Sequence, residues 1–187
     1  MPESDDVTGI VSDEQGYEKF GASAKMWSWP IEEQIAYNQR FMRAFRRNGG
    51  VIDRYYDPEK KIGGDYRGKI PLLILHHTGA KSGASRQTPL SYYDDHGNPV
   101  VVGSDNGSDK APAWVHNLRA DPRVRVELGR EVRTATAKEL SGSERDAVFA
   151  ELVHVLPFQV GNQAKTARTL PLFRLILDPP ADPAGRR

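Results

Sequence analysis

The chain has no cysteine among its 187 residues. This absence excludes disulfide bonds, thiol nucleophiles and cysteine-held metal centres, so any redox chemistry must come from a bound cofactor. Long apolar runs are also missing, because no segment approaches the roughly 18 residues of a membrane span. The acidic first residues lack the basic and apolar regions of a signal peptide. We therefore expect a cytoplasmic protein.

Several catalytic signatures are absent as well. The sequence has no G-x-S-x-G nucleophile elbow, no P-loop and no recognisable pair of catalytic carboxylates. The histidines at positions 76, 77, 96, 116 and 154 show neither HExxH nor facial-triad spacing. His76 and His77 are neighbours, so they point to opposite faces of a strand. The sequence favours neither a hydrolase nor a metal site.

Positively charged residues are absent from the start of the chain. Residues 1–18 contain six acidic and no basic residues, whereas residues 19–187 contain 26 basic and 19 acidic ones. This surplus suits an anionic ligand, but it forms no continuous basic and aromatic face typical of nucleic-acid binding. For the arginine-rich segment 28–47, contact with an anionic membrane and packing on the domain stay as alternatives.

Apolar periodicity and turn residues predict the order of elements. We expect helices at 28–47, 111–120 and 141–156, and strands at 70–77, 85–93, 100–102, 123–128, 131–139 and 170–177. The apolar face of the first helix is expected at Ile31, Ile35, Met42 and Phe45, and one face of the strand at 131–139 at Val132, Thr134 and Thr136. The links between strands are too short for parallel crossovers, so we predict an α+β fold with an antiparallel barrel.

Composition also divides the chain. Residues 1–27 are predicted to be an N-terminal extension that is partly disordered, since the first 14 are acidic and have no apolar cluster. Residues 28–178 are predicted to form a single cofactor-binding domain. Residues 179–187 are predicted to be a frayed tail.

Two segments form the candidate site. The first is the turn Gly79-Ala-Lys-Ser-Gly83, where backbone amides with Lys81 and Arg86 suit a phosphate or carboxylates. A solvated hairpin turn with incidental charges is the alternative. In the strand that follows, Pro89 lacks a ladder donor, which indicates an edge or a bulge.

The second segment is the loop 103–110, rich in Gly, Ser, Asn and Asp, whose backbone can approach a flat ring closely. Trp114 and Asn117, in the helix that follows, lie one helical turn apart and suit one pocket wall, with a core role for Trp114 as the alternative. An anion site beside a ring site favours a nucleotide-like cofactor.

The stretches Thr78-Gly-Ala-Lys-Ser-Gly-Ala-Ser-Arg-Gln-Thr-Pro-Leu90 and Pro112-Ala-Trp-Val-His-Asn-Leu-Arg-Ala-Asp-Pro122 resemble the motifs of the deazaflavin-dependent nitroreductase family of actinobacteria. The resemblance covers about residues 70–177. It implies an α+β, FMN-binding split-barrel-like fold and coenzyme F-420, an 8-hydroxy-5-deazaflavin with a phospholactyl-oligoglutamate tail. It also implies a reductase that transfers a hydride to quinones, activated alkenes (enones) or nitro compounds. An FMN-dependent oxidoreductase and a non-catalytic deazaflavin carrier are the alternatives.

The resemblance also implies site residues by position. The phosphate, the tail and the ring edge are expected at Ala80, Lys81, Ser82, Arg86, Gln87, Thr88, Pro89, Leu90 and Ser91. The ring walls are expected at Val102, Gly103, Ser104 and Asp105, and at Ala113, Trp114, Val115, His116 and Asn117. Ser104 and Tyr92 are the candidate proton donors, and no metal is expected.

The chain departs from this family in its expected substrate pocket, which we assign to Leu156, Gln159 and Asn162. Nitroimidazole-reducing relatives have a tyrosine-rich helix end there, whereas residues 156–163 contain no tyrosine. Ser91 and Asp105 stand where that branch has Tyr and Lys. We therefore expect a pocket that is differently shaped and more acidic.

Overall fold

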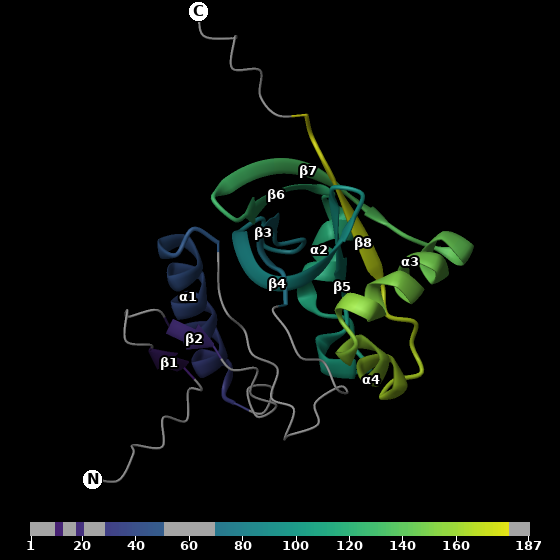
Figure 1. The fold of residues 1–187 in the computed structure, drawn as a ribbon, viewed down its shortest axis with the longest axis horizontal. Helices are drawn as coiled ribbons and strands as arrows, with labels where there is room; N and C mark the ends of the chain where they lie inside the picture. Colours follow the sequence, from purple (N-terminus) through teal and green to yellow (C-terminus); the bar gives the residue numbers. More distant parts are fainter. Residues whose placement is uncertain (1–9, 13–17, 21–28, 51–69, 180–187) are drawn as a thin grey trace, which may run out of the picture.

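The computed structural model describes residues 10–12, 18–20, 29–50 and 70–179. Six antiparallel strands close into a barrel in the order β3-β4-β5-β8-β7-β6 (Figure 1). They are β3 (Leu72–Thr78), β4 (Ser85–Asp95), β5 (Asn98–Val102), β6 (Arg123–Leu128), β7 (Glu131–Glu139) and β8 (Leu172–Leu177). The α-helices of the described part are α1 (Ile31–Arg47), α2 (Ala113–Ala120), α3 (Gly142–Val155) and α4 (Phe158–Ala164). The predicted α+β antiparallel barrel is confirmed.

Hairpins build most of the barrel. β3 pairs with β4 from Leu72 opposite Ser91 to Thr78 opposite Ser85, and β6 pairs with β7 along its whole length. The closing seam is shorter, because β3 and β6 pair only from Ile74 opposite Glu127 to His76 opposite Arg125. Beyond His76 the two strands part, which opens the barrel wall next to the turn after β3.

The barrel interior contains one apolar cluster. Alternate residues of β3, β5, β6, β7 and β8 enter it, such as Leu73 and Leu75 of β3, and Leu90 of β4 packs against it. Helix α2 adds Trp114, whose ring meets that of Phe173 edge-on with centroids 5.9 Å apart. The interior therefore anchors α2, and with it the second sequence motif.

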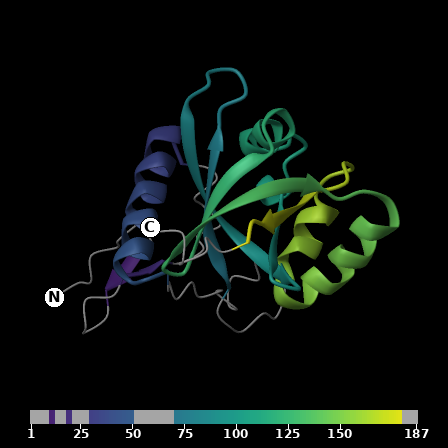
Figure 2. The same cartoon turned by 90° about the horizontal axis from the view of Figure 1, so that it is seen from above.

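A second apolar cluster lies along the outer wall. Figure 2 shows α1 on one side of the barrel and α3 and α4 on the other. Phe41 and Phe45 of α1 and Leu152 of α3 pack in this cluster with the outward-facing Leu72 and Ile74 of β3. Burial of such side chains stabilises the fold by about 1.5–3 kcal/mol each.

The predicted apolar face of α1 is wrong in its first half. Ile31 and Ile35 are 66% and 50% exposed, and the buried stripe starts at Tyr37 and continues through Phe41. Because each helical residue turns by about 100°, Ile35 stands roughly 200° around the axis from Tyr37. On β7 the buried residues are Ala135 and Ala137, whereas Val132 is exposed.

Other differences concern the ends of elements and three elements that were not predicted. Pro30 and Pro112 are N-cap residues, so α1 begins three residues and α2 two residues after the start of the predicted helix. Helix α4 was not predicted, because its seven residues include a glycine and give too short a period. Within the segment predicted to be partly disordered, β1 (Ile10–Ser12) and β2 (Glu18–Phe20) form a two-stranded antiparallel sheet.

Polar contacts and a close backbone approach fix α1 to the barrel. Arg46 Nε and Nη2 donate to Glu127 Oε2 and Oε1 at 2.9 and 2.6 Å, and His76 Nε2 lies 2.6 Å from Oε1. Burial raises the pKa of Glu127, but the hydrogen bonds from Arg46 and His76 bring the pKa below its ordinary value. After the helix, Gly50 packs directly on Gly129 of the β6–β7 turn.

Gly50→Ala is expected to destabilise the protein much more than Gly97→Ala. Both glycines have φ of 84°, so alanine adds a backbone cost of about 1–2 kcal/mol at either site. At Gly50 the new Cβ would also lie 2.1 Å from Gly129 Cα, whereas at Gly97 it meets nothing within 4 Å. We expect an extra loss of about 1–3 kcal/mol for Gly50→Ala in urea unfolding. Equal losses for the two variants would show that the glycine contact contributes nothing.

Candidate functional site

The side chain of Asn117 joins the two sequence motifs. The backbone N–H of Ala80, in the turn after β3, donates to Asn117 Oδ1 at 2.8 Å. Asn117 Nδ2 donates to His77 Nδ1 at 2.9 Å. Since Asn117 and His77 are buried, little water competes for these hydrogen bonds. The turn and α2 are thus held side by side.

The same network sets the state of His77. Asn117 Oδ1 accepts from Ala80, so Nδ2 is the group that donates to His77 Nδ1. His77 Nε2 then carries the proton and donates to Thr88 Oγ1 at 3.0 Å. Burial, followed by the charges of Arg86 and His76, lowers the pKa of His77 from 6.5 to about 4. A neutral imidazole therefore links β3, β4 and α2.

The loop after β5 approaches α2 closely. A Cβ on Gly103 would lie 2.6 Å from Val115 Cγ2 and 2.8 Å from Pro171 Cγ, so a larger residue does not fit. The Gly103 N–H also donates to Pro171 O at 2.8 Å. The two predicted ring walls, at 102–105 and 113–117, are therefore neighbours in space.

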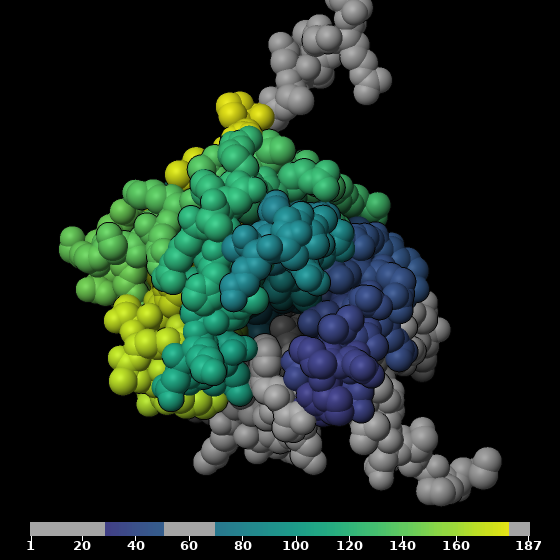
Figure 3. Space-filling view, turned by 180° about the vertical axis from the view of Figure 1, so that it is seen from behind, coloured from purple at the N-terminus to yellow at the C-terminus, as the bar shows by residue number. Residues whose placement is uncertain are grey.

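The segment after α4 holds this loop in place. Arg168 donates from Nη2 to Ser104 O at 2.8 Å and from Nε to Ser108 O at 2.7 Å. Lys165 Nζ donates to Asn106 Oδ1 at 3.0 Å. On the face in Figure 3, the yellow-green α4 lies beside the green-teal loop. The shape of the loop thus depends on the C-terminal third of the chain.

Two non-glycine residues of the loop have left-handed backbone. Asp105 and Asn106 have φ of 47° and 54°, values that cost of order 1 kcal/mol or more. Burial raises the pKa of Asp105, and the charge of Arg168 acts in the opposite direction. Nη1 of Arg168 is buried and has no hydrogen-bond partner among the described residues. Strain and an unused buried donor are features typical of ligand sites.

Lys81 and Arg86 are the free cations of the first motif. Both are exposed, and neither makes a hydrogen bond or an ion pair with any residue that the structure describes. Gln87 points away from them, because its Oε1 accepts from Arg46 Nη2 at 2.9 Å. A turn with two unpaired cations and exposed Ser82 suits a phosphate or carboxylates. The donor set therefore fits an anionic cofactor tail.

The other predicted cofactor residues differ in their accessibility. Trp114 and Val115 are buried in the interior cluster, whereas Ala113 and His116 on the same helix are exposed. Val102 is buried in the outer cluster. Of the predicted cofactor residues on β4, Thr88, Pro89, Leu90 and Ser91 are half-buried, as is Tyr92 next to them. Leu90 and Tyr92 pack against the interior cluster.

The two candidate proton donors lie on different elements, Tyr92 on β4 and Ser104 in the loop after β5. Tyr92 stands opposite Val101 in the ladder, and burial, followed by the charge of Asp94, raises its pKa. Ser104 is buried at the start of the loop, two residues beyond the end of β5. Tyr92 thus stays protonated at neutral pH.

The residues assigned to the substrate pocket are buried. Leu156 is 0% exposed and belongs to the outer cluster. Gln159 and Asn162 are 3% and 8% exposed, and Asn162 Nδ2 donates to Gln159 Oε1 at 3.1 Å. A Cβ on Gly107 would lie 2.6 Å from Asn162 O, so this helix supports the loop directly.

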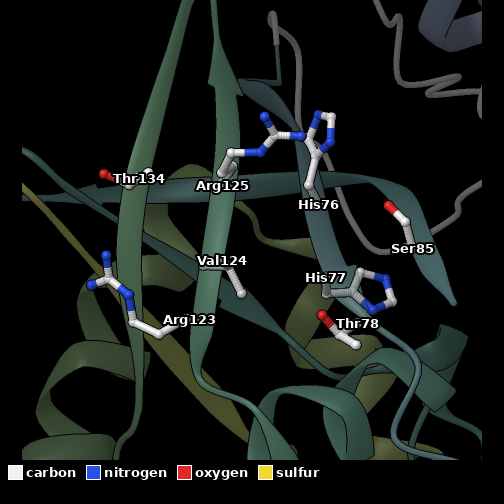
Figure 4. Close-up of a pocket in the computed structure, with 8 residues that line it drawn as sticks. All are labelled: His76, His77, Thr78, Ser85, Arg123, Val124, Arg125 and Thr134. Atoms are coloured by element: carbon white, nitrogen blue, oxygen red, sulfur yellow. The ribbon is translucent and has the colours of Figure 1, made fainter. Parts of the chain in front are cut away.

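Two cavities are lined by residues that the sequence did not predict for the site. One, of about 250 Å³, lies where β3 and β6 part; it is lined by His76, His77, Thr78, Ser85, Arg123, Val124, Arg125 and Thr134 (Figure 4). We call it the β3–β6 groove. The other, of about 540 Å³, lies between the end of α1 and the β6–β7 turn, beside Arg46 and Glu127.

Sequence reasoning missed three residues that shape the site. His77 had a usable signal, because a histidine in an apolar strand needs a buried partner. The sequence contains no comparable signal for Lys165 and Arg168. Their hydrogen-bond acceptors are backbone carbonyls and a side-chain amide about 60 positions away. Within the described ranges, no group of three or more acidic or histidine side chains could hold a metal ion. No helix in those ranges is long and apolar enough to cross a membrane.

Comparisons with known proteins agree with this geometry. The model of a family described as F-420H(2)-dependent quinone reductase matches residues 45–176. A Mycobacterium tuberculosis protein named as an F-420H(2)-dependent quinone reductase is 32% identical over 126 residues, which cover 65% of this chain and 83% of the relative.

Solved structures are similar as well. The structure of an F-420-H2-dependent reductase, FDR-A, is 37% identical with a TM-score of 0.53, and the match covers 56% of this chain and 93% of that one. A domain-swapped dimer is 28% identical with a TM-score of 0.54, covering 78% of this chain and 99% of that one.

His77 is expected to titrate with a pKa of about 4, well below its ordinary value of 6.5. Because the unfolded chain then binds the proton first, folding stability falls as the pH drops from about 6.5 to about 4. NMR titration of the His77 ring measures the pKa, and urea unfolding measures the stability. His77→Gln serves as the comparison, since its stability loses this pH dependence. A midpoint near 6.5 would contradict the buried network.

Proposed function

The chain belongs to the F-420H(2)-dependent quinone reductase family, and from that premise we propose that it transfers a hydride from reduced coenzyme F-420 to a small electron-poor acceptor, a quinone in the first place. One observation supports this most: the Asn117 amide holds the turn with Lys81 and Arg86 beside the helix and loop of the second motif. An anion site and a ring site are thereby adjacent, as one long cofactor requires.

Each part of the site has a proposed task. Lys81 and Arg86 bind the phosphate and the start of the acidic tail through charge-assisted hydrogen bonds. Gly103 to Asp105 and the start of α2 form the walls for the ring, where the tight Gly103–Val115 contact keeps both walls in place. The rigid walls hold the ring and the acceptor at reacting distance and exclude water.

When bound, the reduced deazaflavin supplies a hydride, which is two electrons and one proton, from C5. A second proton must reach the acceptor to complete a hydroquinone. Ser104 and Tyr92 are the candidate donors of this proton, with solvent as the alternative. Tyr92 retains its proton at neutral pH, because burial raises its pKa.

Acceptor choice is proposed to depend on α4 and the loop that it supports. Leu156, Gln159 and Asn162 act from behind the loop, since all three are buried. Asp105 is half-buried and adds an acidic group to the pocket. Reduction of enones and nitro compounds belongs to the proposal as a secondary activity, and without a tyrosine in 156–163 we expect nitro compounds to react more slowly.

Membrane contact through α1 is the alternative proposal for this helix. Of the arginines that suggested it, Arg46 is bound to Glu127 of the barrel, so its charge is already paired. The exposed Ile31 and Ile35 stand beside Glu32 and Glu33, which an anionic surface repels. Packing of the helix on the barrel accounts for most of its buried face.

The cofactor is tested by equilibrium titration of the purified chain with F-420 and with FMN. We expect F-420 to bind and FMN to bind far more weakly. Lys81→Ala and Arg86→Ala should each weaken F-420 binding by about ten-fold or more, because each removes charge-assisted hydrogen bonds. Arg43→Ala, an exposed arginine on α1, is the control and should have no effect. Submicromolar FMN binding without F-420 binding would favour the FMN-dependent alternative.

Turnover separates an enzyme from a carrier. Reduced F-420 is mixed with the protein and a panel of quinones, enones and nitroaromatics, and its oxidation is followed against a reaction without protein. We expect quinones to be reduced fastest. Asn117→Ala should slow the reaction with all acceptors, since it separates the turn from α2. Binding without any oxidation across the panel would support the non-catalytic carrier instead.

A further inference from the structure

The loop that we propose as a ring wall carries a carboxyl without a hydrogen-bond partner. Asp105 directly follows Ser104, it is half-buried, and its carboxyl oxygens make no hydrogen bond with any residue that the structure describes. Asp109, the other acidic residue of the loop, is exposed and accepts from Thr166 Oγ1 at 2.7 Å. A partly buried carboxyl without donors around it is poorly stabilised as an anion.

The backbone of Asp105 is held from both sides in a strained conformation. Its φ of 47° lies in the left-handed region, which costs a non-glycine residue of order 1 kcal/mol or more. Arg168 Nη2 donates to Ser104 O at 2.8 Å, and Lys165 Nζ donates to Asn106 Oδ1 at 3.0 Å. These contacts fix the residue before Asp105 and the residue after it. The contacts of the segment after α4 therefore set the position of the carboxyl.

Arg168 supplies the charge that acts on this carboxyl. Burial raises the pKa of Asp105, and the charge of Arg168 opposes this rise without cancelling it. Helix α4, which packs on the loop, has no charged side chain. Arg168 uses two nitrogens for backbone carbonyls of the loop, whereas its buried Nη1 has no partner among the described residues. A carboxylate formed at Asp105 therefore has an unused N–H group on a nearby cation.

Among the acidic groups near the proposed ring site, Asp105 is the one suited to release a proton near neutral pH. A general acid works best when its pKa lies near the working pH. Burial moves the pKa of Asp105 toward neutrality, whereas it moves the pKa of Tyr92 further above it. The hydroxyl of Ser104 is a far weaker acid than a carboxyl. Glu127, a buried carboxyl of the barrel, is held as an anion by Arg46.

We propose that Asp105 is the catalytic acid that delivers the second proton to the acceptor. This inference rests on the proposed function, in which reduced F-420 supplies the hydride. With a quinone, the hydride brings two electrons and one proton, and the O–H bond of Asp105 then breaks to protonate the oxygen that has become negative. The products are a hydroquinone and the Asp105 carboxylate, which keeps the O–H electron pair beside Arg168. A proton from solvent restores the acid, because Asp105 is only half-buried.

The test is the pH dependence of quinone reduction in a single turnover, so that product release does not mask the chemistry. In the wild type the rate should fall as the pH rises through the pKa of Asp105, because only the protonated acid donates. Asp105→Asn should lower the rate below that pKa by about 100-fold or more and remove the fall. Asparagine tolerates left-handed backbone, so this variant should fold. Asp105→Glu should keep the fall at a reduced rate.

Asp109→Asn is the matched control. It removes a negative charge from the same loop and keeps an oxygen that can accept from Thr166, so the wild-type pH profile should persist. The affinity of each variant for F-420, measured by fluorescence titration, should stay within about three-fold of the wild type.

The outcomes separate this inference from the proposed function. An Asp105→Asn rate with the wild-type size and pH dependence would overturn the role of Asp105 as the acid, while quinone reduction stands. A loss of F-420 affinity as large as the loss of rate would overturn it as well, because Asp105 would then act in cofactor binding. Absence of quinone reduction by the wild type would overturn the proposed function itself.

Discussion

The buried amide of Asn117 is the contact on which the site depends. It binds the backbone of the turn after β3 on one side and the neutral imidazole of His77 on the other. Both partners are fixed in turn, because α2 is anchored by Trp114 in the barrel interior and His77 by Thr88 on β4. The turn and the wall that we propose to bind the anion and the ring are distant in sequence, and this contact joins them in one rigid surface. Such preorganisation is what hydride transfer between two bound molecules requires.

The second constraint comes from the far end of the chain. Arg168 and Lys165 hold the loop that we propose as the other wall, and Asn162 of α4 packs directly against Gly107 within it. Changes in α4 can therefore alter the pocket without touching a ligand.

Much of the fold could be predicted from the sequence, because alternation and turn residues are local signals. The bounds of the β6–β7 hairpin, with strict alternation in its first strand and a turn at Gly129 and Arg130, were predicted to the residue. The position of Ile31 and Ile35 on α1 was not, since only the tertiary contact decides which stripe of a helix is buried. In the site, both motifs were visible as segments, but their junction through Asn117 and His77 joins residues 40 positions apart. The parting of β3 and β6 after His76 leaves no mark in the local pattern.

The central claim is that one cofactor spans the turn of Lys81, the loop at Gly103 and the start of α2. A crystal structure of the chain with oxidised F-420 tests it most directly. The account predicts the deazaflavin ring between the Gly103 loop and α2, with the phosphate within hydrogen-bonding distance of Lys81 and Arg86. A ring bound elsewhere, for example in the cavity beside Arg46 and Glu127, would contradict it.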